Sequence, residues 1–177
     1  MSTVLKYCFL CVVFCAFGIA ANAQDGYTGK IGTKYDQAKN ETSIELAYVP
    51  VSLDKGNMAL LNVSASFPGT KMKEKPDDVI FVVSVVNAKG HKYEDINRVA
   101  VTSGGGDIGQ IMLLNLDQRA FSESEILETL GTRMPLGIFR KLAAAKQSVS
   151  FKIAETTFTI QPDYILKLAE FDKAINP

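Results

Sequence analysis

Single-residue alternation of apolar and polar side chains is the feature that most limits what this chain can fold into. One stretch places Ile44, Leu46 and Tyr48 in alternation with Ser43, Glu45 and Ala47. A second stretch, from Met58 to Phe67, places Leu61, Val63, Ala65 and Phe67 on one face. Because successive side chains of a strand point to opposite faces of its sheet, both stretches predict half-buried β-strands. Pro50 is expected to end the first strand or confine it to a sheet edge.

A longer apolar run, Val79–Val86, has only one polar residue, Ser84. Its β-branched content and the turn-forming residues on both sides predict a strand that is buried on both faces. The charged segment 71–78 should form the loop before this strand. Turns are expected at 54–57 and 87–90, where Asp, Asn and Gly cluster.

The second half of the chain is predicted to combine strands with two helices. The expected elements are a hairpin of 91–102 and 108–117 joined by the glycine turn 103–107, a strand over 126–130 with Glu125 and Glu128 pointing outward, a short helix near 135–146 that starts at Pro135, a hairpin around Ala154-Glu155-Thr156, and a C-terminal helix near 162–175. In the last helix, an apolar stripe for docking is formed by Tyr164, Leu168, Phe171 and Ile175.

Strands that recur about every ten residues between turns predict the fold class. We expect a mainly β protein with a single antiparallel β-sandwich or barrel-like domain, one helix late in the chain and one helix at its end. Residues 24–40 are polar and contain glycine, so they predict a loose N-terminal lead-in with a first strand around Lys30–Tyr35.

The first 23 residues are typical of a secretory signal peptide. Lys6 is the only charged residue, an apolar run extends from Tyr7 to Ile19, and Ala21-Asn22-Ala23 forms a cleavage site. The run is shorter than the roughly 20 residues that a membrane-spanning helix needs. We therefore expect cleavage between Ala23 and Gln24, one domain over 24–177, and export to the periplasm or the medium without a stable membrane span. The alternative is a leader that stays attached as an anchor.

Composition excludes several classes of site. All three cysteines, Cys8, Cys11 and Cys15, lie in the leader, so the processed chain would have no thiol and no disulfide. Loss of Lys6 leaves 18 basic and 19 acidic side chains, which is no basic excess for binding nucleic acid. One histidine and no cysteine cannot supply the usual zinc ligands. We expect no cofactor and no metal.

Three stretches carry a resemblance to known proteins. They are Lys34-Tyr-Asp-Gln-Ala-Lys-Asn-Glu-Thr42, Lys75-Pro-Asp-Asp-Val79, and Met134–Lys146 followed by Ser148–Ile153, Glu155–Phe158 and the closing helix. Together they resemble a group of exported bacterial proteins of unknown function that are expected to be β-rich. The resemblance extends from about residue 33 to residue 175. It implies a bacterial exported β-domain, and it implies no activity and no functional residues.

Two motifs could point to catalysis or nucleotide binding, and the context argues against both. Gly104-Gly-Gly-Asp-Ile-Gly109 matches G-x-G-x-x-G, but the residues that follow resemble a strand rather than a helix, so a hairpin turn is the better interpretation. His91 is the only histidine that a Ser-His-Asp triad could use. No G-x-S-x-G motif accompanies it, and it lies at an expected turn, so we interpret it as an exposed turn residue.

Carboxylate pairs remain as possible acid–base groups. A carboxylate-dependent hydrolase would need two such groups in one pocket, about 5–9.5 Å apart. The candidates are Asp77, Asp78, Asp107, Glu123, Glu125 and Glu128. Glu94 and Asp95 are neighbours that would point to opposite faces of a strand. Asp77 and Asp78 are better explained as charges that keep the following apolar run from aggregating.

The lysines Lys71, Lys73 and Lys75 could contact an anionic polymer, but Glu74, Asp77 and Asp78 neutralise most of their charge. Three hypotheses about function follow. The first is a non-enzymatic exported binding or envelope-associated module whose partner is a protein or an envelope component. The second is a small-ligand carrier with an apolar cavity between sheet and closing helix, and the third is the carboxylate-dependent hydrolase.

Overall fold

The structure, a computed structural model, describes residues 28–54, 58–88, 93 and 95–177. The described elements, in chain order, are β1 (Lys30–Asp36), β2 (Glu41–Leu53), β3 (Met58–Pro68), β4 (Asp78–Ala88), β5 (Ile96–Ser103), β6 (Gly106–Ala120), β7 (Glu125–Pro135), α2 (Leu136–Ala143), β8 (Val149–Ile153), β9 (Thr156–Ile160) and α3 (Pro162–Ala174). The leader with its cleavage site at Ala23 and Gln24, His91 and Glu94 all lie outside the described residues.

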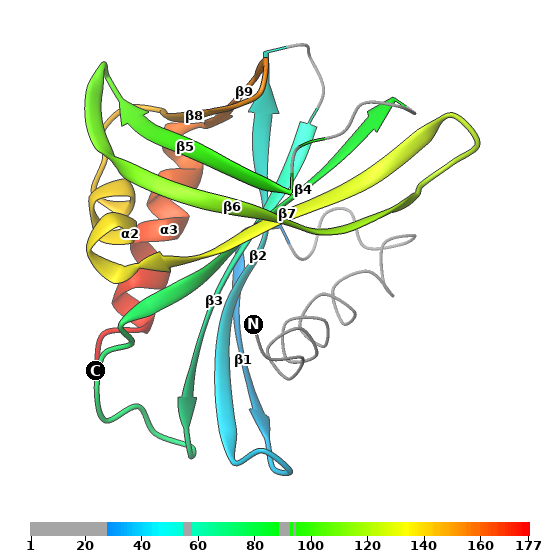
Figure 1. Cartoon of the computed structure of the whole chain (residues 1–177). Coiled ribbons are helices and arrows are strands. Elements are labelled where there is room, and N and C mark those ends of the chain that lie inside the picture. Colours follow the sequence, from blue (N-terminus) through cyan, green and yellow to red (C-terminus); the bar gives the residue numbers. More distant parts are fainter. Residues whose placement is uncertain (1–27, 55–57, 89–92, 94) are drawn as a thin grey trace.

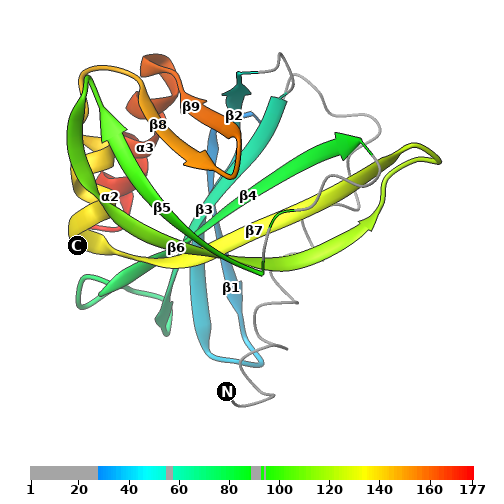
Figure 2. The same ribbon diagram turned by 45° about the horizontal axis from the view of Figure 1, so that its top comes forward.

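Eight of the strands close into an antiparallel barrel (Figure 1). The strand order is β1-β2-β3-β4-β7-β6-β5-β8-β9, and the ring closes where β9 pairs with the end of β2, at Ser52↔Thr159 and Leu53↔Phe158. The mainly β prediction is confirmed, and of its two architectures the structure has the barrel. Figure 2 shows the short β8–β9 hairpin beside the ends of β2 and β3.

The ninth strand, β1, stands outside this ring. It pairs with the first half of β2, from Lys30↔Ala47 to Asp36↔Glu41. On its other side, this half of β2 pairs with β3 as far as Glu41↔Pro68. The barrel partner β4 pairs with β3 only over Ala59–Ser64. All of β1, the first half of β2 and the last residues of β3 therefore form a three-stranded extension beyond the barrel, which we call the arm (Figure 1). The arm comprises residues 30–47 and 65–68.

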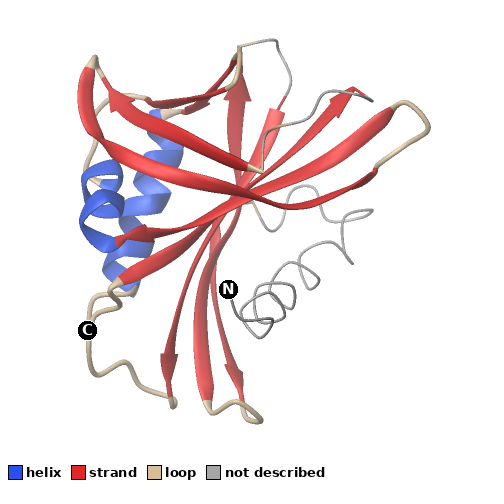
Figure 3. Ribbon diagram, viewed as in Figure 1, coloured by secondary structure: helices blue, strands red, loops and turns tan. Residues whose placement is uncertain are grey.

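The two helices lie together on one side of the barrel (Figure 3). On α2, Leu136, Phe139, Leu142 and Ala143 are buried, as the sequence predicts. On α3, Leu168, Phe171 and Ile175 are buried and Tyr164 is half-buried, so the predicted docking stripe is confirmed, with Ile165 added to it. These side chains join one core with the inward residues of the strands. Among the described residues, neither helix is long and apolar enough to cross a membrane.

Several predicted strands are confirmed at close to their expected bounds. β4 has Val82 and Ser84 on the face opposite Phe81 and Val83, and all four are buried, so the strand is buried on both faces as expected. The glycine turn joins β5 to β6 through Ser103↔Gly106, and β8 and β9 form the expected hairpin. The first strand extends one residue past its predicted end at Tyr35.

Pro50 does not end β2, which continues to Leu53, but it lies at a local edge of the sheet, paired only with Leu60 of β3 among the described residues. Proline is tolerated there because the other side of β2 has no described partner between Ala47, where β1 ends, and Ser52, where β9 begins.

The prediction from alternation that Tyr48 lies on the same face of β2 as Ile44 and Leu46 is wrong. The β2–β3 register shifts between Leu46 and Val49, and Tyr48 adopts a left-handed φ of 58° at this bulge. Its backbone N–H donates to Asn62 Oδ1 at 2.8 Å. The bulge transfers the inward positions from Leu46 to Val49, so Tyr48 is half-buried and Val49 takes the core position.

Candidate functional site

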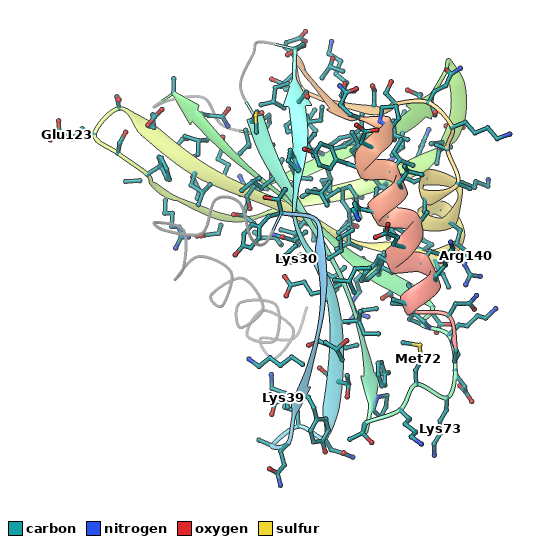
Figure 4. The ribbon with its side chains drawn as sticks, turned by 180° about the vertical axis from the view of Figure 1, so that it is seen from behind. Lys30, Lys39, Met72, Lys73, Glu123 and Arg140 are labelled. Carbon is teal, nitrogen blue, oxygen red and sulfur yellow. The ribbon has the colours of Figure 1, made fainter. Side chains whose placement is uncertain are left out.

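The carboxylates that a hydrolase would need are spread over the molecule. Asp78 and Glu125 lie at opposite ends of the β4–β7 pair, about 30 Å apart at the usual rise of a strand. Asp107 follows the β5–β6 turn, and Glu123 lies at the tip of the β6–β7 hairpin (Figure 4). The described residues contain no group of three or more Asp, Glu, His or Cys side chains that could share a metal ion.

Local contacts occupy several of these groups. Asp78 lies 3.4 Å from Arg133 across the β4–β7 pair, and Glu125 accepts a hydrogen bond from the Ser122 hydroxyl at 3.0 Å. Asp77 is exposed, and its backbone carbonyl accepts the N–H of Leu136 at 2.9 Å. Asp95 is exposed next to β5. These positions are consistent with carboxylates that solvate loops and strand ends.

Glu128 is the exception, and the prediction that it points outward is wrong. Its side chain is fully buried, and Oε2 accepts a hydrogen bond from Asn87 Nδ2 at 2.6 Å while Oε1 accepts one from the Tyr93 backbone N–H at 2.8 Å. In a strand, residues three apart face opposite sides, so Glu125 and Glu128 cannot both point outward. Leu130 and Met134 are buried on the same face as Glu128, which is the sequence signal that could have placed it inside.

The polar cluster around Glu128 joins distant segments of the chain. Asn87, expected in a turn, is instead a buried residue of β4. Tyr93 precedes β5, and its ring lies against Phe158 of β9 with centroids 6.1 Å apart. Burial raises the pKa of the Tyr93 phenol, the polar side chains of Thr156 and Asn87 offset part of the rise, and the negative charges of Glu128 and Asp54 add to it. The cluster thus joins β4, β7 and β9 with Tyr93, which precedes β5, in the interior.

Because Glu128 is fully buried, it cannot contact a substrate without a local opening of the barrel. An acid taken out of water is tolerated only where its oxygens accept hydrogen bonds, and both oxygens do so here. The arrangement fits a structural role: it fixes the backbone of Tyr93, where the chain crosses from β4 to β5.

Aromatic side chains fill the barrel interior. Phe151 and Phe158 stack with ring centroids 5.2 Å apart, and Phe81 meets Phe151 edge to face at 6.1 Å. Between the helices, Phe139 and Phe171 meet edge to face at 5.8 Å. All five are among the largest fully buried side chains.

The glycine motif lies in the β5–β6 turn and in the start of β6. Gly104 has a φ of 56°, which favours glycine, and the end of the exposed Gln147 side chain lies where a side chain on Gly104 would point. The residues that follow form a strand, so the helix N-terminus that would bind a pyrophosphate is not part of this motif. The geometry explains its first glycine by the turn.

The lysine-rich segment 71–75 lies between β3 and β4, as predicted. Met72 turns inward and packs against the core, whereas Lys71, Lys73 and Lys75 are exposed (Figure 4). The acidic residues Glu74 and Asp77 of the same loop are exposed as well. The loop therefore presents mixed charge rather than a cationic surface.

The arm is the feature that the sequence prediction missed. At the tip of the β1–β2 hairpin, the Tyr35 hydroxyl donates a hydrogen bond to Asn40 Oδ1 at 2.9 Å. Asp36 Oδ1 accepts the N–H groups of Ala38 and Lys39, at 3.0 and 3.2 Å, which fixes the turn. Tyr35 is 43% exposed, one of the few large apolar side chains on the described surface.

The arm also carries a partly desolvated acid. Glu45 of β2 stands opposite Gly32 of β1, and burial raises the pKa of its carboxyl, an effect that the charge of Lys34 partly offsets. The arm thus combines an exposed ring, alternating charges and a strand edge. It is our candidate contact surface.

Comparison with known proteins gives no relative from which a site could be transferred: no family model, no curated protein and no solved structure matches this chain.

Proposed function

We propose that this protein is an exported binding module without enzymatic activity, which acts through surface contact at its arm. Its partner would be a protein or another component of the cell envelope. The observation that carries the proposal is the three-stranded arm, which extends beyond the closed barrel and presents Tyr35 to solvent. An exposed strand edge is a recurring site for pairing with another chain.

The buried residues of the interior also bear on this proposal. Stacked aromatic side chains lie in the interior, and the buried acid Glu128 is held by Asn87 and the Tyr93 backbone. Glu128 is therefore out of reach of a partner, whereas Tyr35 on the arm is exposed. Export rests on the N-terminal leader, and it predicts a processed chain that begins at Gln24.

Site-specific photo-crosslinking tests the proposal in the cells that make the protein. A photoreactive residue replaces Tyr35 on the arm in one variant and Leu166 on α3 in a control variant. Leu166 is 64% exposed and Tyr35 is 43% exposed, so exposure alone would favour adducts at the control position. We expect adducts in the exported fraction at position 35 and few at position 166, on a chain whose N-terminus is Gln24.

Two results would contradict the proposal. One is an absence of adducts at position 35, and the other is an equal or greater yield at position 166. A chain found in the cytosol with its leader intact would refute the export half independently.

A further inference from the structure

β1 is an edge strand of the described sheet. Among the strands that the structure describes, it lies at one end of the order and pairs only with β2. It is seven residues long, has no proline, and pairs with β2 without a register shift. Natural sheets commonly protect such edges with proline, bulges, very short strands or charged side chains, and of these features β1 has only the charges of Lys30, Lys34 and Asp36. The sequence of β1, Lys30-Ile-Gly-Thr-Lys-Tyr-Asp36, determines which kind of strand could pair with this edge.

The sequence of β1 is complementary to itself in the antiparallel direction. When two copies meet around a two-fold axis at Thr33, every residue of the strand has a partner, which no other symmetric register achieves. Lys30 then stands opposite Asp36 of the second copy, at both ends of the pair. Opposite charges that face each other across strands stabilise a sheet, and like charges destabilise it.

The apolar residues match in the same register. Ile31 stands opposite Tyr35 of the second copy, and this pairing of a β-branched with an aromatic side chain is favourable across strands. Ile31 is half-buried against the core, and Tyr35 is 43% exposed. Pairing would cover the exposed ring twice, once in each copy.

The remaining pair in this register is Gly32 with Lys34. Gly32 faces Lys34 of the second copy, and behind Gly32 on β2 stands Glu45. Two strand spacings separate the Lys34 and Glu45 backbones, about 9.5 Å, which the two long side chains can bridge if nothing lies between them. A side chain at Gly32 would lie between them, and the space there is open. The partly desolvated Glu45 carboxyl would gain a second cation.

We propose that the arm pairs with a second copy of this chain through β1, in antiparallel register around Thr33, so that three strands from each copy form one continuous sheet. This inference rests on the proposed function and names the partner at the arm. The two-fold interface is isologous, so each contact occurs twice. One strand from each copy gives a small interface, so the dimer is weak and depends on concentration.

A charge-swap experiment on protein purified from the exported fraction tests the register. Lys30→Asp places two carboxylates opposite each other at both ends, and Asp36→Lys places two ammonium groups there. Sedimentation over a wide concentration range should show that each variant alone associates about tenfold more weakly than the wild-type chain, because two pairs change sign. An equal mixture of the two variants restores opposite charges at both ends and should recover dimerisation.

Lys73→Asp makes the same change of charge on the exposed loop before β4 and should leave association unchanged. Circular dichroism checks that each variant keeps the fold. A chain that stays monomeric at every concentration overturns the inference, and so does a dimer that is insensitive to both variants or is not restored by mixing. Adducts at position 35 to a different protein, with a monomeric chain in solution, would overturn the second copy as partner and leave the proposed function standing.

Discussion

Glu128 is a fully buried acid whose two oxygens each accept one hydrogen bond, from the Asn87 amide and from the Tyr93 backbone N–H. Both donors are buried with it, so the energetic importance of Glu128 lies in the groups that it satisfies. Buried donors that lose their acceptor keep the full cost of leaving water. The residue therefore matters more for stability than its charge alone would indicate.

Glu128→Ala should lower the free energy of unfolding by about 3 kcal/mol, because it leaves two buried N–H donors without an acceptor. Glu128→Gln keeps one carbonyl acceptor and should cost about 1 kcal/mol. Urea denaturation measures both. Glu155→Ala, at a side chain that is 85% exposed, is the control and should change stability little. Equal effects of Glu128→Ala and Glu155→Ala would contradict the buried position of Glu128.

Tyr93 is predicted to make the folded protein less stable at alkaline pH. Its folded pKa is raised above the ordinary value of 10.0, mainly by burial. The folded state thus retains the phenolic proton longer than the unfolded state, and the stability that this contributes is present below pH 10 and is lost as the pH rises through the raised value. Tyr93→Phe should flatten the fall of the unfolding midpoint above pH 10.

The matched control is Tyr35→Phe, on the exposed arm, which keeps Tyr93 and should keep the wild-type alkaline loss. Urea midpoints measured at several pH values distinguish the two variants. An identical alkaline dependence for Tyr93→Phe and the wild-type chain would show that Tyr93 does not set this limit.

At the scale of elements, the β8–β9 hairpin turns through two residues, Ala154 and Glu155, between Ile153 and Thr156. Ala154 has a φ of 50°, in the left-handed region that costs an alanine about 1 kcal/mol. The hairpin carries Phe158, which stacks on Phe151, and Leu53 of β2 pairs with it to close the ring. Strain in this turn therefore affects a strand on which barrel closure depends.

Ala154→Gly should raise the free energy of unfolding by about 0.5–1 kcal/mol, since glycine adopts a positive φ without the steric cost. Ala100→Gly makes the same chemical change in the exposed, extended part of β5 and should lower stability by about the same amount. Thermal or urea unfolding compares the two. Effects of the same sign would contradict the left-handed turn.

Local sequence predicts some of these strands and not others. Strands with local signals, such as β3, β4 and the β8–β9 hairpin, lie close to their predicted bounds because alternation and turn residues are encoded nearby. The bulge at Tyr48 and the tolerance of Pro50 depend on which strands lie beside β2, which no local pattern contains. Glu128 had a local signal in the alternation with Leu130 and Met134, and the error was to give Glu125 and Glu128 the same face.

At the scale of the whole molecule, one core joins the inward residues of the barrel with those of α2 and α3. The helices are tied by Phe139 against Phe171 and by Arg140, whose Nε lies 3.1 Å from Asp172. Barrel closure links residues about a hundred positions apart, at Leu53↔Phe158, and so could not be read from local sequence. The arm was missed for the same reason, since β1 becomes an edge of the described sheet only once the ring closes without it.

A shared core predicts one cooperative unfolding transition for the purified protein. Far-ultraviolet circular dichroism, which follows the strands, and near-ultraviolet signals, which follow the packed tyrosines and phenylalanines, should give coincident urea curves. Reducing agent should leave the midpoint unchanged in the processed chain, whose cysteines would all have left with the leader. Two separate transitions would indicate that the helices and the barrel unfold as independent units.

Amide hydrogen exchange measured at low protein concentration tests whether eight strands form a closed ring with β1 at the edge of the described sheet. We expect strong protection throughout β2, β3, β4, β7, β6, β5, β8 and β9, including Ser52 and Thr159 at the closure, and exchange in β1 that is about 100-fold faster. Raising the concentration should slow exchange in β1 alone. Fast exchange at Ser52 and Thr159, or protection of β1 equal to that of the ring at every concentration, would contradict the account.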